Sequence, residues 1–230
     1  MTPPVALRPE LRSSPWVLLL PFVLVALAVA GAASGGSGTR ADGTSPLSNL
    51  PYAIGALVVY LVVLAIAYVC VRRSPDWRAT LGLVRPPAWA AAFWLAIGLV
   101  VGGLVLGQAL DRVLHASKAQ GLGGELARGT QASIAIAISF ATLAIVGPIV
   151  EELVFRGLVT SAIRGRLGAV ATPIASGTLF ALAHGDLHIV LALLPLGIAL
   201  GFVYERTGSI VPGMVTHVLY NAIGVIAVLL

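Results

Sequence analysis

Charge is scarce in this chain of 230 residues. Asp, Glu, Lys and Arg together make up 10% of the sequence, whereas a typical soluble domain carries about 25%. Residues of the set AVILMFWYC make up 58%, and the mean hydropathy is +0.99. A surface that faces water cannot be built from this composition, which argues against a soluble enzyme, a nucleic-acid-binding protein and a disordered protein.

Cysteine is almost absent, and so are the common motifs of soluble enzymes. Cys70 is the only cysteine, which excludes an intramolecular disulfide and a metal site built from several cysteines. We interpret it as a small apolar side chain. The sequence has no GxGxxG, no P-loop, no CxxC and no HExxH motif, and no serine lies in a GxSxG elbow beside its polar clusters. The residues that carry chemistry must therefore be sought elsewhere.

Seven windows without any Asp, Glu, Lys or Arg dominate the chain. Each has 18 residues or more, and a helix needs about 20 mostly apolar residues to cross a bilayer core of about 30 Å. Apolar runs of this length are helical in lipid. We therefore predict an all-α, polytopic membrane helix bundle of about seven to eight transmembrane helices. The predicted spans are 16–33, 51–71, 88–110, 131–150 and beyond, 169–184, 187–204 and 209–230.

The basic residues predict how these spans are oriented. Ten of the 14 lie in the N-terminal segment and in the segments after spans two, four and six, and four lie in the opposite loops. Because cytoplasmic loops are enriched in Lys and Arg, we expect the N-terminus in the cytoplasm and the C-terminus outside. The first span also resembles a signal peptide, and we interpret it as an uncleaved anchor. We divide the chain into three N-terminal spans with their loops (1–129) and a transmembrane core that contains the remaining spans (130–230).

Three clusters of polar residues interrupt the last four spans, where ionisable groups are costly and usually functional. On a helix, residues four apart share a face. Glu152 is therefore predicted to pair with Arg156, while Glu151 points about 100° away from Glu152. The other two clusters show the same spacing of four. The clusters are Glu151-Glu152-Leu153-Val154-Phe155-Arg156, Phe180 with His184, and His217 with Asn221.

The depth of each cluster in the membrane decides whether the three can meet. Counted from the predicted cytoplasmic boundaries, His217 lies about 15 Å deep and His184 about 24 Å deep. Glu151 lies about 20 Å deep only if the helix of span four continues to Ile163. The apolar residues after Arg156 favour that continuation, so we predict it, with a bend at Pro148.

The convergence of such groups favours peptide-bond hydrolysis. A poorly solvated carboxylate can act as a general base on water, and two His side chains with an Asn amide can stabilise a developing oxyanion. Two His and one Glu are also a catalytic zinc set, which here would be Glu151, His184 and His217. Other interpretations stay open: a charged helix end at the headgroups, an interfacial His184, and His217 with Asn221 as interhelical hydrogen bonds.

The clusters resemble the three motifs of the CPBP family, which includes Ras-converting CAAX prenyl proteases and bacteriocin-processing or immunity (Abi) proteins. The matching residues lie within about 130–225, and their order and spacing are similar to those of the family. They are Glu151-Glu152-x-x-Phe155-Arg156-Gly157, Phe180-x-x-x-His184 and His217-x-x-x-Asn221.

This resemblance implies an intramembrane endopeptidase. It makes Glu151 the general base, lets His184 orient water or substrate, and gives oxyanion stabilisation to His217 and Asn221. The supporting residues are Glu152, Phe155, Arg156 and Phe180. The family has been described both as metal-dependent and as metal-independent; we expect no metal, with zinc as the alternative.

The substrate implied is a peptide, a leader sequence or a membrane protein rather than a prenylated CAAX protein. The Arg-rich and Ala-rich composition, with a single Lys, suggests a GC-rich bacterial genome, so we expect the plasma membrane of a bacterium. The expected partners are the lipid bilayer and this substrate, and no nucleic acid. The alternative is a non-enzymatic immunity or membrane scaffold protein that retains the motifs. A small transporter would more often show an internal repeat, which we do not find.

Overall fold

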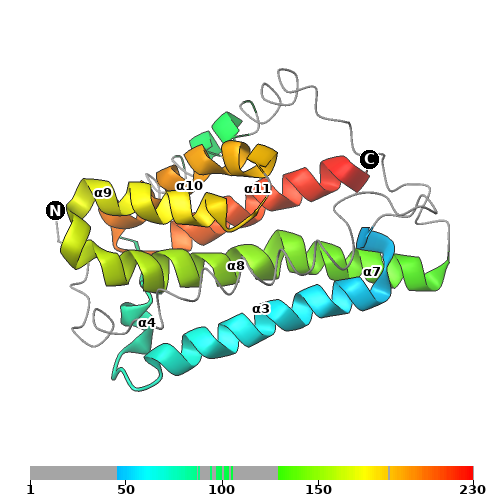
Figure 1. Ribbon diagram of the computed structural model, residues 1–230, viewed down its shortest axis with the longest axis horizontal. Helices are drawn as coiled ribbons and strands as arrows, with labels where there is room; N and C mark the ends of the chain where they lie inside the picture. The colour runs from blue at the N-terminus through cyan, green and yellow to red at the C-terminus, as the bar shows by residue number, and fades with distance from the viewer. Residues whose placement is uncertain are drawn as a thin grey trace.

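The computed structural model describes residues 46–86, 88, 94, 97–99, 101–103, 105, 129–185 and 187–229. Predicted span one (16–33) lies outside these residues, as does most of span three (88–110), so the total number of spans stays a prediction. Within the described residues every regular element is helical and none is a strand. This confirms the predicted all-α class (Figure 1).

The first long helix, α3 (Leu50–Val71), matches predicted span two. Asn49 caps its start by accepting a hydrogen bond from the Tyr52 N–H at 3.0 Å, with proline in the first turn, a combination typical of helix N-termini. Its 22 residues extend about 33 Å, enough to cross a bilayer core. A short 3₁₀ helix, η1 (Pro46–Ser48), precedes it, and α4 (Trp77–Thr80) follows it.

Predicted span four is a rod assembled from several consecutive helical segments (Figure 1). It continues past Glu151 and Ile163, as predicted, and ends at Gly168, where φ is +78°. This left-handed conformation favours glycine and reverses the chain. A π-helical turn stands immediately before Pro148, at the predicted bend. The segments are α7 (Thr130–Ala141), the π-helix η2 (Thr142–Val146), α8 (Gly147–Glu152), the π-helix η3 (Leu153–Thr160) and the start of α9 (Ser161–Leu182).

Beyond Gly168 the rest of α9 packs against α10 (Leu187–Thr207) through small residues. A Cβ atom added at Gly177 would lie 2.4 Å from the backbone nitrogen of Ile198, and one added at Gly201 would lie 3.0 Å from Pro173 Cα. The two backbones are therefore nearly in contact. Such packing is common between membrane helices because lipid supplies no hydrophobic force that would drive larger side chains together.

The last helix is α11 (Val211–Leu229), and its start lies where three connections meet. The Ile210 N–H donates to the Gly82 carbonyl at 2.9 Å, and the Ser209 hydroxyl donates to the Val84 carbonyl at 2.6 Å. Arg164, just before the Gly168 turn, forms an ion pair with Glu205 near the end of α10, with 2.6 Å between Nη2 and Oε1. Three segments predicted to face the cytoplasm therefore lie at one end of the bundle.

One basic residue counted as cytoplasmic belongs elsewhere. Arg156 is fully buried inside the bundle, because the helix that carries it continues past it toward Gly168. Its removal from the count leaves nine basic residues instead of ten in the cytoplasmic set, against four in the opposite set. The asymmetry keeps its sign, and the orientation of the termini stays a prediction.

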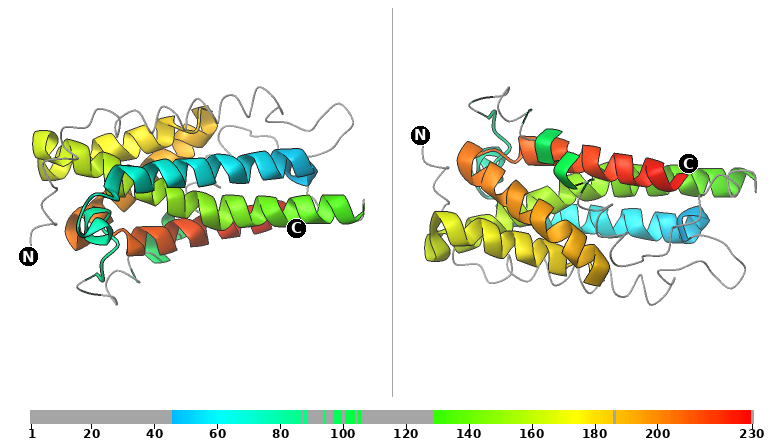
Figure 2. Two further views of the ribbon diagram at one scale, coloured as in Figure 1. Left: turned by 90° about the horizontal axis from the view of Figure 1, so that it is seen from below. Right: turned by 90° about the horizontal axis from the view of Figure 1, so that it is seen from above.

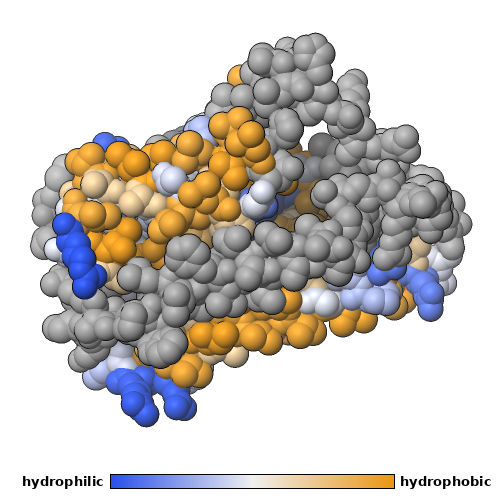
Figure 3. Space-filling model, in the orientation of Figure 1, coloured by the Kyte–Doolittle hydropathy of each residue, from blue (hydrophilic) through white to orange (hydrophobic). Residues whose placement is uncertain are grey.

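The surface has the pattern of a multi-pass membrane protein. On the face drawn in Figure 3, most of the coloured surface between the two ends is hydrophobic, and the most hydrophilic residues lie mainly toward the ends. Figure 2 shows α3 alongside the rod that contains α7 and α8. In the described part of the chain, three helical stretches are long and apolar enough to cross a membrane: Leu50–Val71, Thr130–Leu182, which reverses at Gly168, and Ile189–Thr207. Val211–Ile226 is a shorter apolar helix.

Candidate active site

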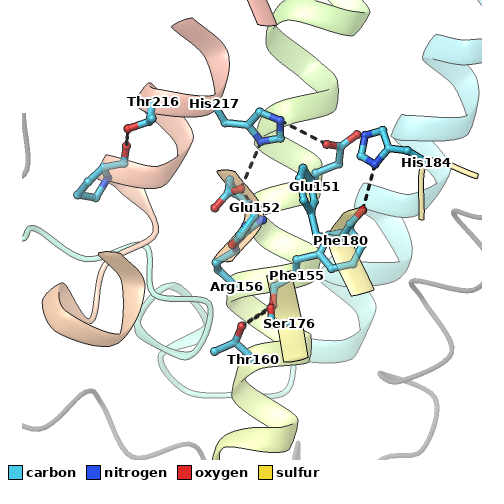
Figure 4. A network of polar contacts seen from close by, with 12 residues as sticks. Glu151, Glu152, Phe155, Arg156, Thr160, Ser176, Phe180, His184, Thr216 and His217 are labelled. Atoms are coloured by element: carbon cyan, nitrogen blue, oxygen red, sulfur yellow. Dashed lines mark hydrogen bonds and ion pairs between the residues drawn. The ribbon is translucent and has the colours of Figure 1, made fainter. Parts of the chain in front are cut away.

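The ionisable residues of the three clusters come from helices that pack together (Figure 4). Glu151 and Glu152 end α8, Arg156 lies in η3, His184 follows α9, and His217 lies in α11. Glu152 and Arg156 are completely buried, His217 is 1% exposed and Glu151 9%. Ionisable side chains so deep in an apolar bundle are costly unless they are paired or used.

Arg156 and Glu152 form the predicted pair. The Arg156 Nη1 donates to Glu152 Oε1 at 2.7 Å, and Nη2 donates to the backbone carbonyl of Gly197 at 2.8 Å. The guanidinium also lies over the Phe180 ring, 4.8 Å from its centroid. Salt bridge, carbonyl and aromatic ring together hold the buried cation in one position.

Glu151 has different neighbours from Glu152. Its Oε1 accepts a hydrogen bond from the Tyr60 hydroxyl at 2.6 Å. Its Oε2 is buried and has no hydrogen-bond partner among the described residues, and lies 3.7 Å from His217 Nε2. The two adjacent carboxylates thus have separate surroundings, as predicted from the helical repeat.

His217 lies between the two carboxylates. Its Nδ1 is 3.3 Å from Glu152 Oε1, and its Nε2 faces Glu151. Because an ionised carboxylate only accepts hydrogen bonds, the Nδ1–H is the donor toward Glu152. Glu152 therefore orients the imidazole and directs its Nε2 at the unpartnered oxygen of Glu151.

His184 lies beside the Glu151 carboxylate in Figure 4. Its Nδ1 is 3.0 Å from the Phe180 carbonyl, one helical turn earlier. The Phe180 ring makes edge contacts with the rings of Phe155, His184 and His217, at centroid distances of 5.4, 5.1 and 5.3 Å. The two phenylalanines that the motifs assigned to support therefore pack directly against the site.

Asn221 contacts another part of the rod. Its Nδ2 donates to the Leu143 carbonyl in η2 at 3.0 Å, and no hydrogen bond joins it to Glu151, His184 or His217 within the described part of the chain. The amide has a second N–H, so its predicted role as an oxyanion donor stays a prediction.

The π-helix η3 leaves a carbonyl that side chains satisfy. The Thr160 and Ser176 hydroxyls lie 2.8 and 3.2 Å from the Phe155 oxygen. π-Helical turns are rare and are often found at functional sites. Here they lie on both sides of the segment that carries Glu151 and Glu152.

Three contributors to the site were missed in the sequence. Tyr60 had a signal, since a tyrosine at the middle of a span departs from the usual placement at the membrane interface. Gly197 had one too, because Gly197 and Gly201 have the spacing of small residues at helix contacts. No feature of the sequence indicates Gly213, because only the fold brings it close to Glu152. A Cβ atom added there would lie 2.8 Å from Glu152 Oε2.

The zinc alternative requires three ligands in one place. Across the residues that the structure describes, no three His, Cys, Asp or Glu side chains are arranged to hold a metal ion. Glu151 and His217 face each other, but together with His184 they do not form such a group. We derive no catalytic step through a metal.

Comparisons with known proteins agree with the three motifs. Residues 133–223, which contain every motif residue, match the model of a family described as type II CAAX prenyl endopeptidase Rce1-like. This part of the chain is thus similar to that family, and the predicted CPBP resemblance is confirmed.

Among individual proteins, 110 residues are 30% identical to the Bacillus subtilis (strain 168) protein named "Putative membrane peptidase YdiL". That match covers 46% of this chain and 45% of the relative, so the chain spans less than half of the relative's length. No solved structure gives a significant match to the chain.

Proposed function

We propose that this protein is an intramembrane endopeptidase that hydrolyses a peptide bond in a membrane-associated protein or peptide. One observation carries the proposal: Glu151 Oε2 is buried, lacks a hydrogen-bond partner among the described residues and faces His217 Nε2 across 3.7 Å. A free carboxylate oxygen beside an imidazole is suited to binding and deprotonating water.

In the proposed reaction, Glu151 Oε2 takes a proton from water as the water oxygen bonds to the scissile carbonyl carbon. His217, when it carries both ring protons, and Asn221 donate to the resulting oxyanion, and His184 orients the water or the substrate. The proton on Glu151 then passes to the amine nitrogen as the C–N bond breaks. Glu151 returns to its carboxylate form.

Glu152 and Arg156 contribute to this proposal as a framework. Arg156 compensates the charge of Glu152, and Glu152 holds His217 through Nδ1. Without this pair the imidazole would lose the contact that directs Nε2 at Glu151. Oriented groups are what convert a bound water into an efficient nucleophile.

The membrane setting is proposed in the same terms. The Arg-rich and Ala-rich composition, with a single Lys, supports a bacterial plasma membrane protein. The excess of basic residues in alternate segments supports an N-terminus in the cytoplasm and a C-terminus outside. A substrate that reaches Glu151 has to enter the apolar bundle, which favours a membrane-anchored peptide or protein.

The replacement Glu151→Gln tests the proposed function, because it keeps the shape of the side chain and removes the base. Wild type and variant are reconstituted in liposomes with internally quenched peptides, with and without a C-terminal prenylated CAAX sequence. We expect cleavage by Glu151→Gln to be lower by about 1000- to 10,000-fold. The matched control is Glu205→Gln, which removes a carboxylate at the end of the bundle and should leave turnover nearly unchanged.

Each other result has a definite meaning. Unchanged cleavage by Glu151→Gln rejects Glu151 as the base. A binding-only immunity or scaffold protein predicts no cleavage by the wild type and an unchanged cellular phenotype in the variant. Loss of activity with a chelator and recovery with zinc would replace the base mechanism with a metal one. Cleavage confined to the prenylated peptides would overturn the expected substrate class.

A further inference from the structure

Tyr60 is a polar side chain that lies far from the three motifs in sequence and next to Glu151 in space. It is the eleventh of the 22 residues of α3, and its hydroxyl lies 2.6 Å from Glu151 Oε1, across 91 positions of sequence. Tyrosines in membrane helices usually lie near the ends, where the hydroxyl meets water. The middle of a span is a costly place for a hydroxyl unless it has a partner, and Glu151 is that partner.

Gly147 is the second part of this arrangement. A Cβ atom added there would lie 3.0 Å from Tyr60 Cζ and 3.0 Å from its hydroxyl oxygen. Gly147 is four residues before Glu151, so both lie on one face of α8. The tyrosine ring thus crosses the helix where the side chain is missing and reaches the carboxylate one turn later.

The hydrogen bond decides which carboxylate oxygen faces His217. The terminal torsion of a glutamate is soft, so a carboxylate whose oxygens have no fixed partner can rotate and exchange their positions. A short O–H···O⁻ bond is among the stronger hydrogen bonds in proteins. With Oε1 engaged by Tyr60, Oε2 is the oxygen directed at His217 Nε2.

We propose that Tyr60 is a positioning residue of the active site, which holds Glu151 so that Oε2 is presented to the attacking water. This inference rests on the proposed function of Glu151 as the base. It makes α3, which lies outside the segment 133–223 matched by the family model, a part of the catalytic apparatus.

The test compares Tyr60→Phe with wild type in liposomes, using the quenched peptides that the wild type cleaves. Phenylalanine keeps the ring over Gly147 and removes only the hydroxyl. We expect kcat to fall about 10- to 100-fold with KM unchanged, because the base is misplaced while substrate contacts remain. The matched control is Tyr68→Phe, on the same helix with a side chain 52% exposed; it should behave as wild type.

A second variant approaches the same contact from the opposite helix. Gly147→Ala should displace the tyrosine ring and lower kcat in the wild-type background. If it acts through the Tyr60 hydroxyl, it should cause a smaller further loss in Tyr60→Phe, since neighbouring groups that act on one contact are not additive. Equal losses in both backgrounds would contradict this route.

The possible failures are distinguishable. A wild-type kcat in Tyr60→Phe, together with an inactive Glu151→Gln, overturns the positioning role and leaves the proposed function standing. A raised KM at unchanged kcat overturns it too, because it would make Tyr60 a substrate contact. Full activity of Glu151→Gln rejects the base itself, and with it any role for Tyr60 in positioning one.

Discussion

Glu151 and Glu152 are neighbours in sequence with identical side chains, yet they lie in two different regions of the polar cluster. On the Glu152 side, one oxygen meets both the Arg156 guanidinium and the His217 ring. The other oxygen has no hydrogen-bond partner among the described residues, and a Cβ atom added at Gly213 would lie 2.8 Å from it. Among the described residues, no Lys or Arg forms an ion pair with Glu151: a neutral hydroxyl binds one oxygen, and the other faces His217 without a hydrogen bond.

In the proposed mechanism, this difference lets one helix supply both a framework group, Glu152, and a base, Glu151, from the same residue type. Adjacent residues point about 100° apart, so each carboxylate meets a different set of helices. Each carboxylate has one oxygen without a hydrogen-bond partner among the described residues, but only Glu152 is paired with Arg156. An ion-paired carboxylate is the poorer proton acceptor, because the nearby cation favours its charged form. Position around the helix, rather than residue type, separates the two roles.

The largest effect on stability is expected from Arg156→Ala, which removes the ion-pair partner of Glu152. Both partners of this ion pair are 0% exposed, so the variant leaves an uncompensated buried carboxylate, at a cost of about 3–5 kcal/mol in the free energy of unfolding. The measurement is folded yield and unfolding in detergent.

Arg164→Ala is the matched control for Arg156→Ala. The Arg164–Glu205 pair has the same chemistry, but its side chains are 30% and 11% exposed. Its loss should cost less than about 1 kcal/mol, as for other pairs that are open to solvent. Equal losses in the two variants would remove the distinction between a buried framework pair and an ordinary one.

Much of the fold could be predicted because membrane spans appear in the sequence as long apolar windows without charged residues. Charge-free windows located α3 and α10, and apolar residues after Arg156 predicted the continuation of the rod past Ile163. The π-helical segments could not be predicted, since their composition does not differ from that of the α-helix around them. Arg156 was wrongly counted with the cytoplasmic residues. A charged residue after an apolar run is typical of the end of a membrane span, and only the structure shows that Arg156 is buried and paired with Glu152.

In the site, contacts within one helix could be predicted, whereas contacts between distant parts of the sequence could not. The Glu152–Arg156 pair follows from a spacing of four on one helix, and it was predicted. The hydrogen bonds of Tyr60 and Asn221 join positions 91 and 78 residues apart, and the second ends on a backbone carbonyl. No residue pattern encodes a carbonyl as a partner, so contacts of this kind emerge only from the packing of the helices.

Asn221→Ala is expected to have the next largest effect, this time on turnover. It tests whether a hydrogen-bond donor acts together with Glu151. If the free N–H of the amide stabilises the oxyanion, turnover should fall about 100- to 1000-fold, less than for Glu151→Gln. The lost hydrogen bond to Leu143 should cost only about 1 kcal/mol of unfolding free energy. Turnover and unfolding free energy are measured on one preparation. A loss of stability with full activity would mean that Asn221 only links two helices through its hydrogen bond to Leu143.

The smallest effect on turnover is expected from Gly213→Ala, which crowds Glu152 without removing any polar group. The added Cβ would lie 2.8 Å from Glu152 Oε2, and the carboxylate cannot easily yield because Arg156 and His217 hold its other oxygen. Overpacking of this kind costs about 1–3 kcal/mol, from which the helix propensity of alanine recovers part. We expect a net loss of about 1–2 kcal/mol in unfolding free energy.

Gly224→Ala provides the comparison on the same helix, because nothing lies within 4 Å of its added Cβ. There only the propensity gain of up to about 1 kcal/mol should be seen, so the two substitutions should change stability in opposite directions. Since Glu152 orients His217 through Nδ1, turnover should also decline in Gly213→Ala and not in Gly224→Ala. If both variants keep full turnover while Gly213→Ala is destabilised, Glu152 supports the fold alone, and the orientation of His217 has to come from its contacts with Phe180 and Glu151.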